Sequence, residues 1–241
     1  MSTATMLLPF DLPNRSTFLV TDELFSPADF IIHSHVAAQA KDRSYRCLIV
    51  SMLPDVSRWK AIAAKSKLNI AEKVASGSIT FIDVLPLIRP SRGEDSPRLH
   101  DLFDAVSSNL SRFNSEDSDV ILDGISSLQW MGIPSKDVVR FHRAVRGLCR
   151  KFGSTLLIRH HVVTPTQPDD VFRMLLQLCT YHIDVRPLAS GRSGAVSGEV
   201  TLYFGPSTRL IQGVQGNRRL QYRLSDNSAV FFERGMAGGI L

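Results

Sequence analysis

The sequence has 241 residues, of which 44% are hydrophobic and 21% charged, so it can bury a full core and fits one domain of the larger α/β kind. Its formal net charge of +5 at pH 7 mildly favours an acidic partner such as RNA, although proteins of many other functions share such a charge. No run of about 18 apolar residues is present, which excludes a membrane-spanning helix. We also expect no secretory signal, because the first residues lack a basic segment followed by an apolar one.

Residues 1–15 are expected to form a flexible arm, followed by a single domain over 16–241. Segments rich in β-branched and apolar residues predict buried strands over Ser16–Asp22, Tyr45–Met52 and Ile79–Val84. A helix is expected to begin at Ser26, the N-cap, with Pro27 as its first residue. Residues 86–96 are rich in Pro, Arg and Ser and are interpreted as a surface loop.

The second half of the chain continues the alternation. The strongest helix is predicted over Ser135–Phe152, ending at Gly153. The remaining predicted elements are a helix from Leu99, strands at Val120–Leu122, Thr155–Ile158 and Ile183–Val185, a helix at Asp170–Leu178, and antiparallel strands at Glu199–Phe204, Arg219–Leu224 and Ala229–Glu233. This order predicts an α/β fold with a mainly parallel sheet flanked by helices and antiparallel C-terminal strands, which is typical of RecA-like NTPases.

The turn after the first buried strand lacks the phosphate-binding loop of such NTPases. That loop reads G-x-x-x-x-G-K-[ST], and its glycines and lysine hold the phosphates. Here the chain has no Gly before Gly77 and no Lys before Lys41, while Asp22 and Glu23 would repel phosphate. Asp123 stands where a Walker-B acid would be, but we interpret it as bonding local backbone. We therefore predict no nucleotide site, no cofactor and no ATP hydrolysis on this chain.

Histidines and cysteines do not suggest a metal site. Cys47, Cys149 and Cys179 are far apart in apolar stretches, which is typical of reduced core cysteines in an intracellular protein. His160 and His161 would point to opposite faces of a strand, and residues 33 and 35 do not share a helix face.

Arginines gather in two parts of the chain. Arg143 and Arg150 lie off the apolar stripe of the long helix, where they form either a solvated face or one that meets RNA or a subunit. The C-terminal loops carry further candidates for RNA or subunit contacts: Arg186, Arg192, Arg209, Arg218 and Arg219. An arginine donated to a neighbour's nucleotide site would be Arg159 or Arg186.

The C-terminal stretch Gln221–Leu241 resembles the signature of the sixth-subunit family of the Elongator complex. The matching residues are Tyr222, Asp226, Phe231, Phe232, Arg234, Gly235, Met236 and Leu241. The resemblance implies a RecA-like fold without nucleotide motifs, and a hetero-hexameric ring with Elongator subunits four and five. It further implies association with the larger subunits one to three, binding of tRNA, and support of wobble-uridine modification in the cytoplasm, with the nucleus also open. Phe231 and Phe232 would pack internally or against a subunit, and Met236 to Leu241 would be available to a partner.

Two other functions remain open at this stage. The chain could be an α/β enzyme that binds an anion through the glycine-rich residues 191–198, in which Arg192 would be essential. It could also be a stand-alone RNA-binding module that uses the basic helix face with Arg143 and Arg150, whose binding would weaken with salt.

Overall fold

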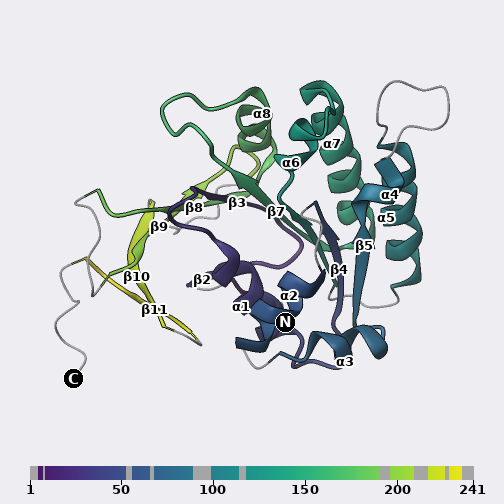
Figure 1. Cartoon of the computed structure of the whole chain (residues 1–241), viewed down its shortest axis with the longest axis horizontal. Coiled ribbons are helices and arrows are strands. Elements are labelled where there is room, and N and C mark those ends of the chain that lie inside the picture. Colours follow the sequence, from purple (N-terminus) through teal and green to yellow (C-terminus); the bar gives the residue numbers. More distant parts are fainter. Residues whose placement is uncertain are drawn as a thin grey trace.

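The computed structural model describes residues 5–7, 9–52, 56–65, 68–88, 99–113, 118–189, 196–208, 217–225 and 228–234. Its centre is a nine-stranded sheet in the order β11-β10-β9-β8-β3-β7-β6-β4-β5 (Figure 1). These strands are β3 (Thr17–Asp22), β4 (Arg46–Ser51), β5 (Ile79–Asp83), β6 (Ser118–Asp123), β7 (Thr155–His161), β8 (Tyr181–Arg186), β9 (Gly198–Phe204), β10 (Arg218–Leu224) and β11 (Ala229–Phe232). Neighbours from β8 to β5 are parallel and those from β8 to β11 are antiparallel, which confirms the predicted α/β fold class.

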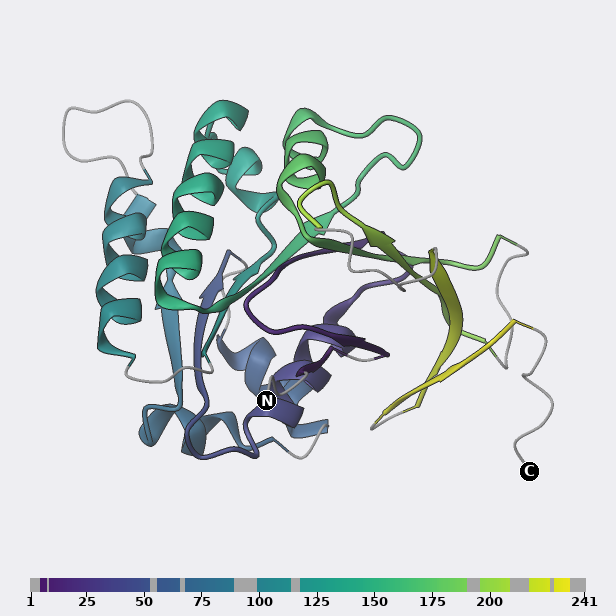
Figure 2. The ribbon, with the colours of Figure 1, turned by 180° about the vertical axis from the view of Figure 1, so that it is seen from behind.

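Helices cover both faces of the parallel part of the sheet (Figures 1 and 2). One face carries α1 (Asp29–Gln39), α2 (Val56–Lys65) and α3 (Ile70–Ala75), and the other carries α4 (Val84–Ile88), α5 (His100–Arg112), α6 (Ser127–Trp130), α7 (Ser135–Phe152) and α8 (Asp170–Leu178). Because successive strand residues point to opposite faces, Phe18 and Val20 join the first core while Leu19 joins the second. Among the described helices, none is long and apolar enough to cross a bilayer.

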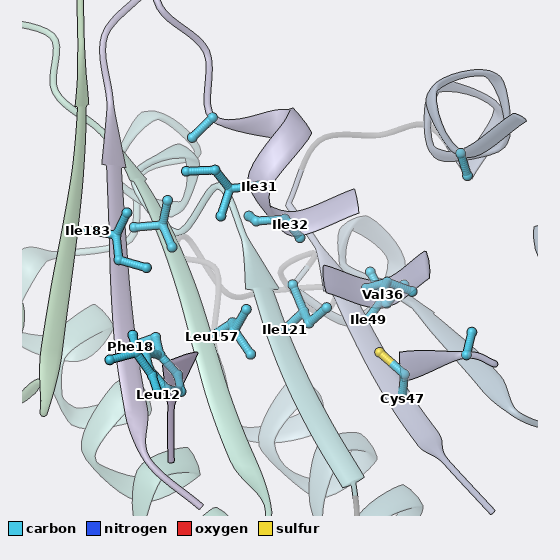
Figure 3. Close-up of a cluster of buried hydrophobic side chains, with 14 of the residues drawn as sticks. Leu12, Phe18, Ile31, Ile32, Val36, Cys47, Ile49, Ile121, Leu157 and Ile183 are labelled. Carbon is cyan, nitrogen blue, oxygen red and sulfur yellow. The ribbon is translucent and has the colours of Figure 1, made fainter. Parts of the chain in front are cut away.

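Figure 3 shows how α1 is held on its face of the sheet. Ile31, Ile32 and Val36 of this helix lie over Ile121 and Ile49 of the central strands. All five side chains are fully or almost fully buried, so each one removes apolar surface from water. This packing fixes the position of the helix and thereby of the turn that leads into it.

The N-terminal segment is more ordered than expected. A two-stranded antiparallel hairpin forms from β1 (Thr5–Leu7) and β2 (Phe10–Leu12). Phe10 and Leu12 belong to the core under α1, and Leu12 lies beside Phe18 in Figure 3. A loose arm therefore does not describe these residues, because their burial ties the segment to the sheet. A single domain over 16–241 stays a prediction.

Two local predictions are wrong. The first helix begins at Asp29, with Ala28 as its N-cap residue, instead of at Ser26 and Pro27. Ser26 is used otherwise, since its N–H donates to the Glu23 carbonyl at 2.9 Å and closes a turn. Part of the loop expected over residues 86–96 is helical, because α4 extends to Ile88, which is buried. Residues 89–98 lie outside the described part.

Candidate functional site

The functional region of this fold class is the edge at which the parallel strands end. In β3 and β7 the paired residues Asp22 and His161 end their strands together, and the Val162 N–H donates to the Asp22 carbonyl at 2.8 Å. On the other side of β7, the Ile125 N–H donates to the Arg159 carbonyl at 2.9 Å and ties in the turn after β6. We call this region the carboxyl edge and define it as residues 22–29, 123–131 and 159–164.

The turn between β3 and α1 is organised by the carboxylate of Asp22, which is only 1% exposed. Its Oδ2 accepts the Ala28 N–H at 2.7 Å, and its Oδ1 lies 2.5 Å from Nδ1 of His161. A phosphate-binding loop would offer such N–H groups at the start of a helix to the phosphates of a nucleotide. In this chain a side-chain carboxylate takes an N–H at the start of the helix.

A buried arginine forms the second part of the carboxyl edge. The Arg159 side chain is 1% exposed, with Nη1 at 2.6 Å from Asp29 and Nε at 2.8 Å from Asp123. The indole N–H of Trp59 donates to the other oxygen of Asp123 at 2.8 Å. Asp123 was expected to bond local backbone, and this is wrong, because a guanidinium on the neighbouring strand and an indole on α2 reach its carboxylate instead.

The charges of this cluster balance one another. Burial raises the pKa of Asp29, but the guanidiniums of Arg159 and Arg58 bring it below its ordinary value. Burial also opposes the charge of Arg159, yet the carboxylates of Asp123 and Asp29 hold its pKa above the ordinary value. Burial lowers the pKa of His33 to about 4, so this ring, which lies 4.0 Å from the Trp59 ring, is neutral at pH 7. The positive charge of Arg159 is therefore compensated by carboxylates inside the chain, although its Nη2 makes no hydrogen bond within the described residues.

Exposed apolar side chains surround this charged interior. Within the carboxyl edge, Leu24 is 89% exposed, Phe25 76%, Trp130 67% and Val163 71%. Sequence reasoning missed all four. A signal was present at the first two, because turn tips favour Gly, Asn, Asp, Ser and Pro, whereas this turn places Leu and Phe at its tip.

The predicted contact residues lie in separate places. Arg143 and Arg150 are exposed on α7, and Arg218 and Arg219 are exposed on β10, far along the sheet (Figure 1). The Arg218 guanidinium lies 5.7 Å from the centre of the Phe10 ring, which ties it to the N-terminal hairpin. Arg192, Arg209, Met236 and Leu241 lie outside the described residues.

The two arginines considered as donors to a neighbouring site differ in access. Arg159 is buried between two carboxylates, so the prediction that it could reach a neighbour is wrong. Arg186 has a side chain that is 58% exposed, but its Nε lies 2.6 Å from Asp184. Glu23 lies near both groups, and burial raises the pKa of Glu23 although Arg186 opposes this.

The C-terminal phenylalanines are half-buried. Phe231 lies 6.1 Å from Phe30 of α1 and 6.5 Å from Tyr222 of β10 between ring centres. Phe232 is also half-buried. Internal packing therefore accounts for part of the Phe231 surface, and contact with a partner stays a prediction for both residues.

His160 and His161 both pair with carboxylates. His160 Nε2 lies 3.0 Å from Asp169, and His161 contacts Asp22. Among the described residues, the group whose potential metal-ligand atoms lie within 4.8 Å of one another is His100, Asp101 and Asp104 on α5. All three are exposed, and exposed acidic groups are common without an ion, so we assign no metal to them.

Comparison with known proteins identifies relatives along most of the chain. The chain is 20% identical over 255 residues to Elongator complex protein 6 of Xenopus tropicalis, covering 96% of this chain and 95% of that protein. It is 22% identical over 237 residues to Elongator complex protein 6 of Xenopus laevis, covering 88% of each.

A solved structure shows the same fold. The KaiC-like protein of the hyperthermophilic archaeon Pyrococcus horikoshii superposes with a TM-score of 0.69 at 9% identity, over 96% of this chain and 99% of that protein. At this identity the likeness shows the fold alone, and it confirms the predicted RecA-like class. The model of the family described as Elongation complex protein 6 matches residues 7–226. The chain therefore belongs to the Elongation complex protein 6 family.

Proposed function

We propose that this chain is a non-catalytic subunit of the Elongator complex. It assembles a hetero-hexameric ring with subunits four and five, associates with subunits one to three, binds tRNA and supports the modification of wobble uridine. The family match and the RecA-like fold support the membership. The observation that supports the non-catalytic role and the assembly is the carboxyl edge, where buried charges of the chain itself fill the interior and exposed apolar side chains surround it.

A non-catalytic role follows from the chemistry of that edge. Phosphoryl transfer needs backbone N–H groups and a lysine around the phosphates, with a metal to neutralise developing charge. Here Asp22 holds the Ala28 N–H, and Arg159 is neutralised by Asp29 and Asp123. A nucleotide would have to displace these bonds and would meet the carboxylates of Asp22 and Asp123. The proposed role therefore requires no cofactor. We place the chain in the cytoplasm, and a place in the nucleus stays open.

The proposed contact with tRNA uses exposed arginines. Arg143 and Arg150 are exposed and lie seven residues apart on α7, so they project from one side of the helix two turns apart. Guanidinium groups in such positions contact phosphates and add affinity without reading the base sequence. Arg186, Arg218 and Arg219 are additional candidates on the C-terminal strands.

The assembly is tested by native mass spectrometry of this chain expressed together with Elongator subunits four and five of the same organism. We expect one particle of six chains that contains all three proteins. A monomer, or a particle built of this chain alone, would contradict the ring.

The non-catalytic role is tested by equilibrium dialysis of the purified chain with labelled ATP. We expect no saturable binding at millimolar ATP and no release of phosphate. Binding that is lost in Arg192→Ala would favour the α/β enzyme with an anion loop. Salt-sensitive binding of tRNA by the isolated chain would favour the stand-alone RNA-binding module.

A further inference from the structure

The turn from Glu23 to Ser26 has an unusual tip. Its ends are joined by the bond from the Ser26 N–H to the Glu23 carbonyl at 2.9 Å, so Leu24 and Phe25 are its two central residues. They are 89% and 76% exposed, the two largest exposures among the large apolar side chains of the described residues. Leaving two such side chains in water costs free energy in proportion to their apolar area. The tip is therefore a candidate for burial against another molecule.

The base of this turn is fixed on both sides. Asp22, directly before it, bonds the Ala28 N–H at 2.7 Å and contacts His161 on β7. Ser26 itself is only 2% exposed, so the far end of the turn lies in the protein interior. A tip held in this way loses little conformational freedom when it binds, and preorganisation of this kind increases affinity.

The electrostatic surroundings indicate the chemistry of the partner. Three charged groups next to the tip are paired within the chain: Asp22 with His161, Arg159 with Asp29 and Asp123, and Arg186 with Asp184. Glu23, which is half-buried at the start of the turn, lies within electrostatic reach of Arg186. The other exposed side chains of the edge, which are Pro27, Trp130, Val163 and Thr164, carry no charge. Nucleic acid is bound through free cations, and the described part of this edge offers none, so the complementary surface is an uncharged apolar one.

On a second copy of this chain, three hollows of the described surface contain charged side chains beside apolar ones. A hollow of about 310 Å³ contains Lys60, and one of about 450 Å³ contains Lys136, Arg140, Arg143 and Asp170. A third, of about 470 Å³ between α5 and α7, combines the apolar Leu99, Phe103, Ile133, Phe141 and Ala144 with His100, Asp137 and Arg140. Each of these hollows matches the uncharged tip less well than a wholly apolar pocket would, because burying a charged side chain costs desolvation energy.

We infer that Leu24 and Phe25 insert into an uncharged apolar pocket on a different protein chain of the same assembly. This inference rests on the proposed function, since it takes the partner to be a neighbouring subunit. Asp22 is then a positioning residue, because it holds the turn in the shape that enters the pocket. Large buried side chains near the centre of an interface contribute most to binding, so this turn would dominate one subunit contact of the chain.

The test compares variants of the assembly reconstituted from this chain and Elongator subunits four and five. We expect the double variant Leu24→Ser, Phe25→Ser to weaken association of a neighbouring subunit by about tenfold or more, read by native mass spectrometry over a dilution series. The control variant Val74→Ser on α3 removes an apolar side chain that is 42% exposed, and should leave association unchanged. Circular dichroism checks that all variants fold.

A second measurement places a photo-crosslinking phenylalanine derivative at position 25 in the assembled particle. We expect a crosslink to apolar residues of a different subunit, and none from the same derivative at position 74.

The outcomes separate the two proposals. If the wild-type chains do not assemble, the proposed function fails before the turn is tested. If they assemble and the double variant assembles equally well, only the role of the turn is overturned. It is also overturned if position 25 crosslinks to a second copy of this chain, or if the double variant loses tRNA binding while assembly is unchanged.

Discussion

The carboxyl edge and the outer face of α7 both present arginines, yet the two regions have opposite electrostatic character. At the edge, Arg159 is 1% exposed and lies between Asp29 and Asp123. On α7, Arg143 and Arg150 are exposed, and among the described residues no carboxylate lies within ion-pair distance of either. The same residue type is thus a structural cation in one place and a free charge in the other. What decides its role is whether acidic groups from other elements reach it.

Removing the buried cation is the most direct test of this difference between the two regions. We expect Arg159→Met to lower the free energy of unfolding by about 3–5 kcal/mol, because Asp29 and Asp123 lose the charge that compensates their burial. Arg150→Met is the matched control on α7 and should change stability by about 0.5 kcal/mol or less. Urea unfolding followed by circular dichroism measures both. Equal losses would mean that the two arginines do not differ as the structure indicates.

The second prediction concerns the stability that the Asp22 carboxylate contributes by accepting the Ala28 N–H at the start of α1. Asp22→Ala leaves the buried Ala28 N–H and the His161 ring without their acceptor, which should cost about 1–3 kcal/mol of stability. Asp22→Asn keeps one oxygen for the N–H and should cost less. The same unfolding experiment ranks the two variants, and a larger loss for Asn than for Ala would contradict the assigned bond.

On the buried side of α7, His142 is expected to make the stability of the fold depend on pH. His142 is fully buried directly beside the exposed Arg143, and burial lowers its pKa to about 3. The unfolded chain binds a proton at this residue at about pH 6.5, so the stabilising effect of the neutral ring is complete above that pH. As the pH falls from about 6.5 towards 3, the folded state should lose about 1.4 kcal/mol per pH unit from this histidine.

The variant His142→Leu tests this directly. It keeps an apolar group of similar size in the core and removes the titrating group, so unfolding free energies measured at several pH values should fall less steeply below pH 6.5. His33, whose pKa burial lowers to about 4, remains in the variant and sustains part of the slope. An unchanged slope would show that His142 is accessible to protons in the folded state.

The smallest effect on stability is expected on the outer face of α7. The double variant Arg143→Ala, Arg150→Ala should change the unfolding free energy by about 0.5 kcal/mol or less. In the reconstituted assembly it should weaken tRNA binding and reduce the slope of log affinity against log salt by about two, one for each phosphate contact. Arg112→Ala, an exposed arginine on α5, is the control. A slope equal to that of the wild type would remove α7 from the proposed tRNA surface.

Sequence periodicity determined the elements that depend on local interactions. The bounds of α7 and α8 agree with the predicted ones, because each has a continuous apolar stripe and a local end signal. Gly153 ends α7 with a φ of 69°, a conformation that glycine adopts without strain. The absence of a phosphate-binding loop could also be recognised from the sequence, because this motif depends on residue types within one turn.

Only the tertiary structure decided how the carboxyl edge is filled. Asp22 and His161 are 139 residues apart in the chain, and Asp29 and Arg159 are 130 apart. Both pairs meet because β3 and β7 are neighbours in the sheet. No local sequence pattern encodes the pairing of these two strands. The same holds for the N-terminal hairpin, whose Phe10 and Leu12 acquire their burial from the core under α1. Local sequence therefore indicates strongly amphipathic helices and the absence of a phosphate-binding motif. Strand order depends on packing over the whole chain, and it determines which charges neutralise one another and which side chains remain exposed.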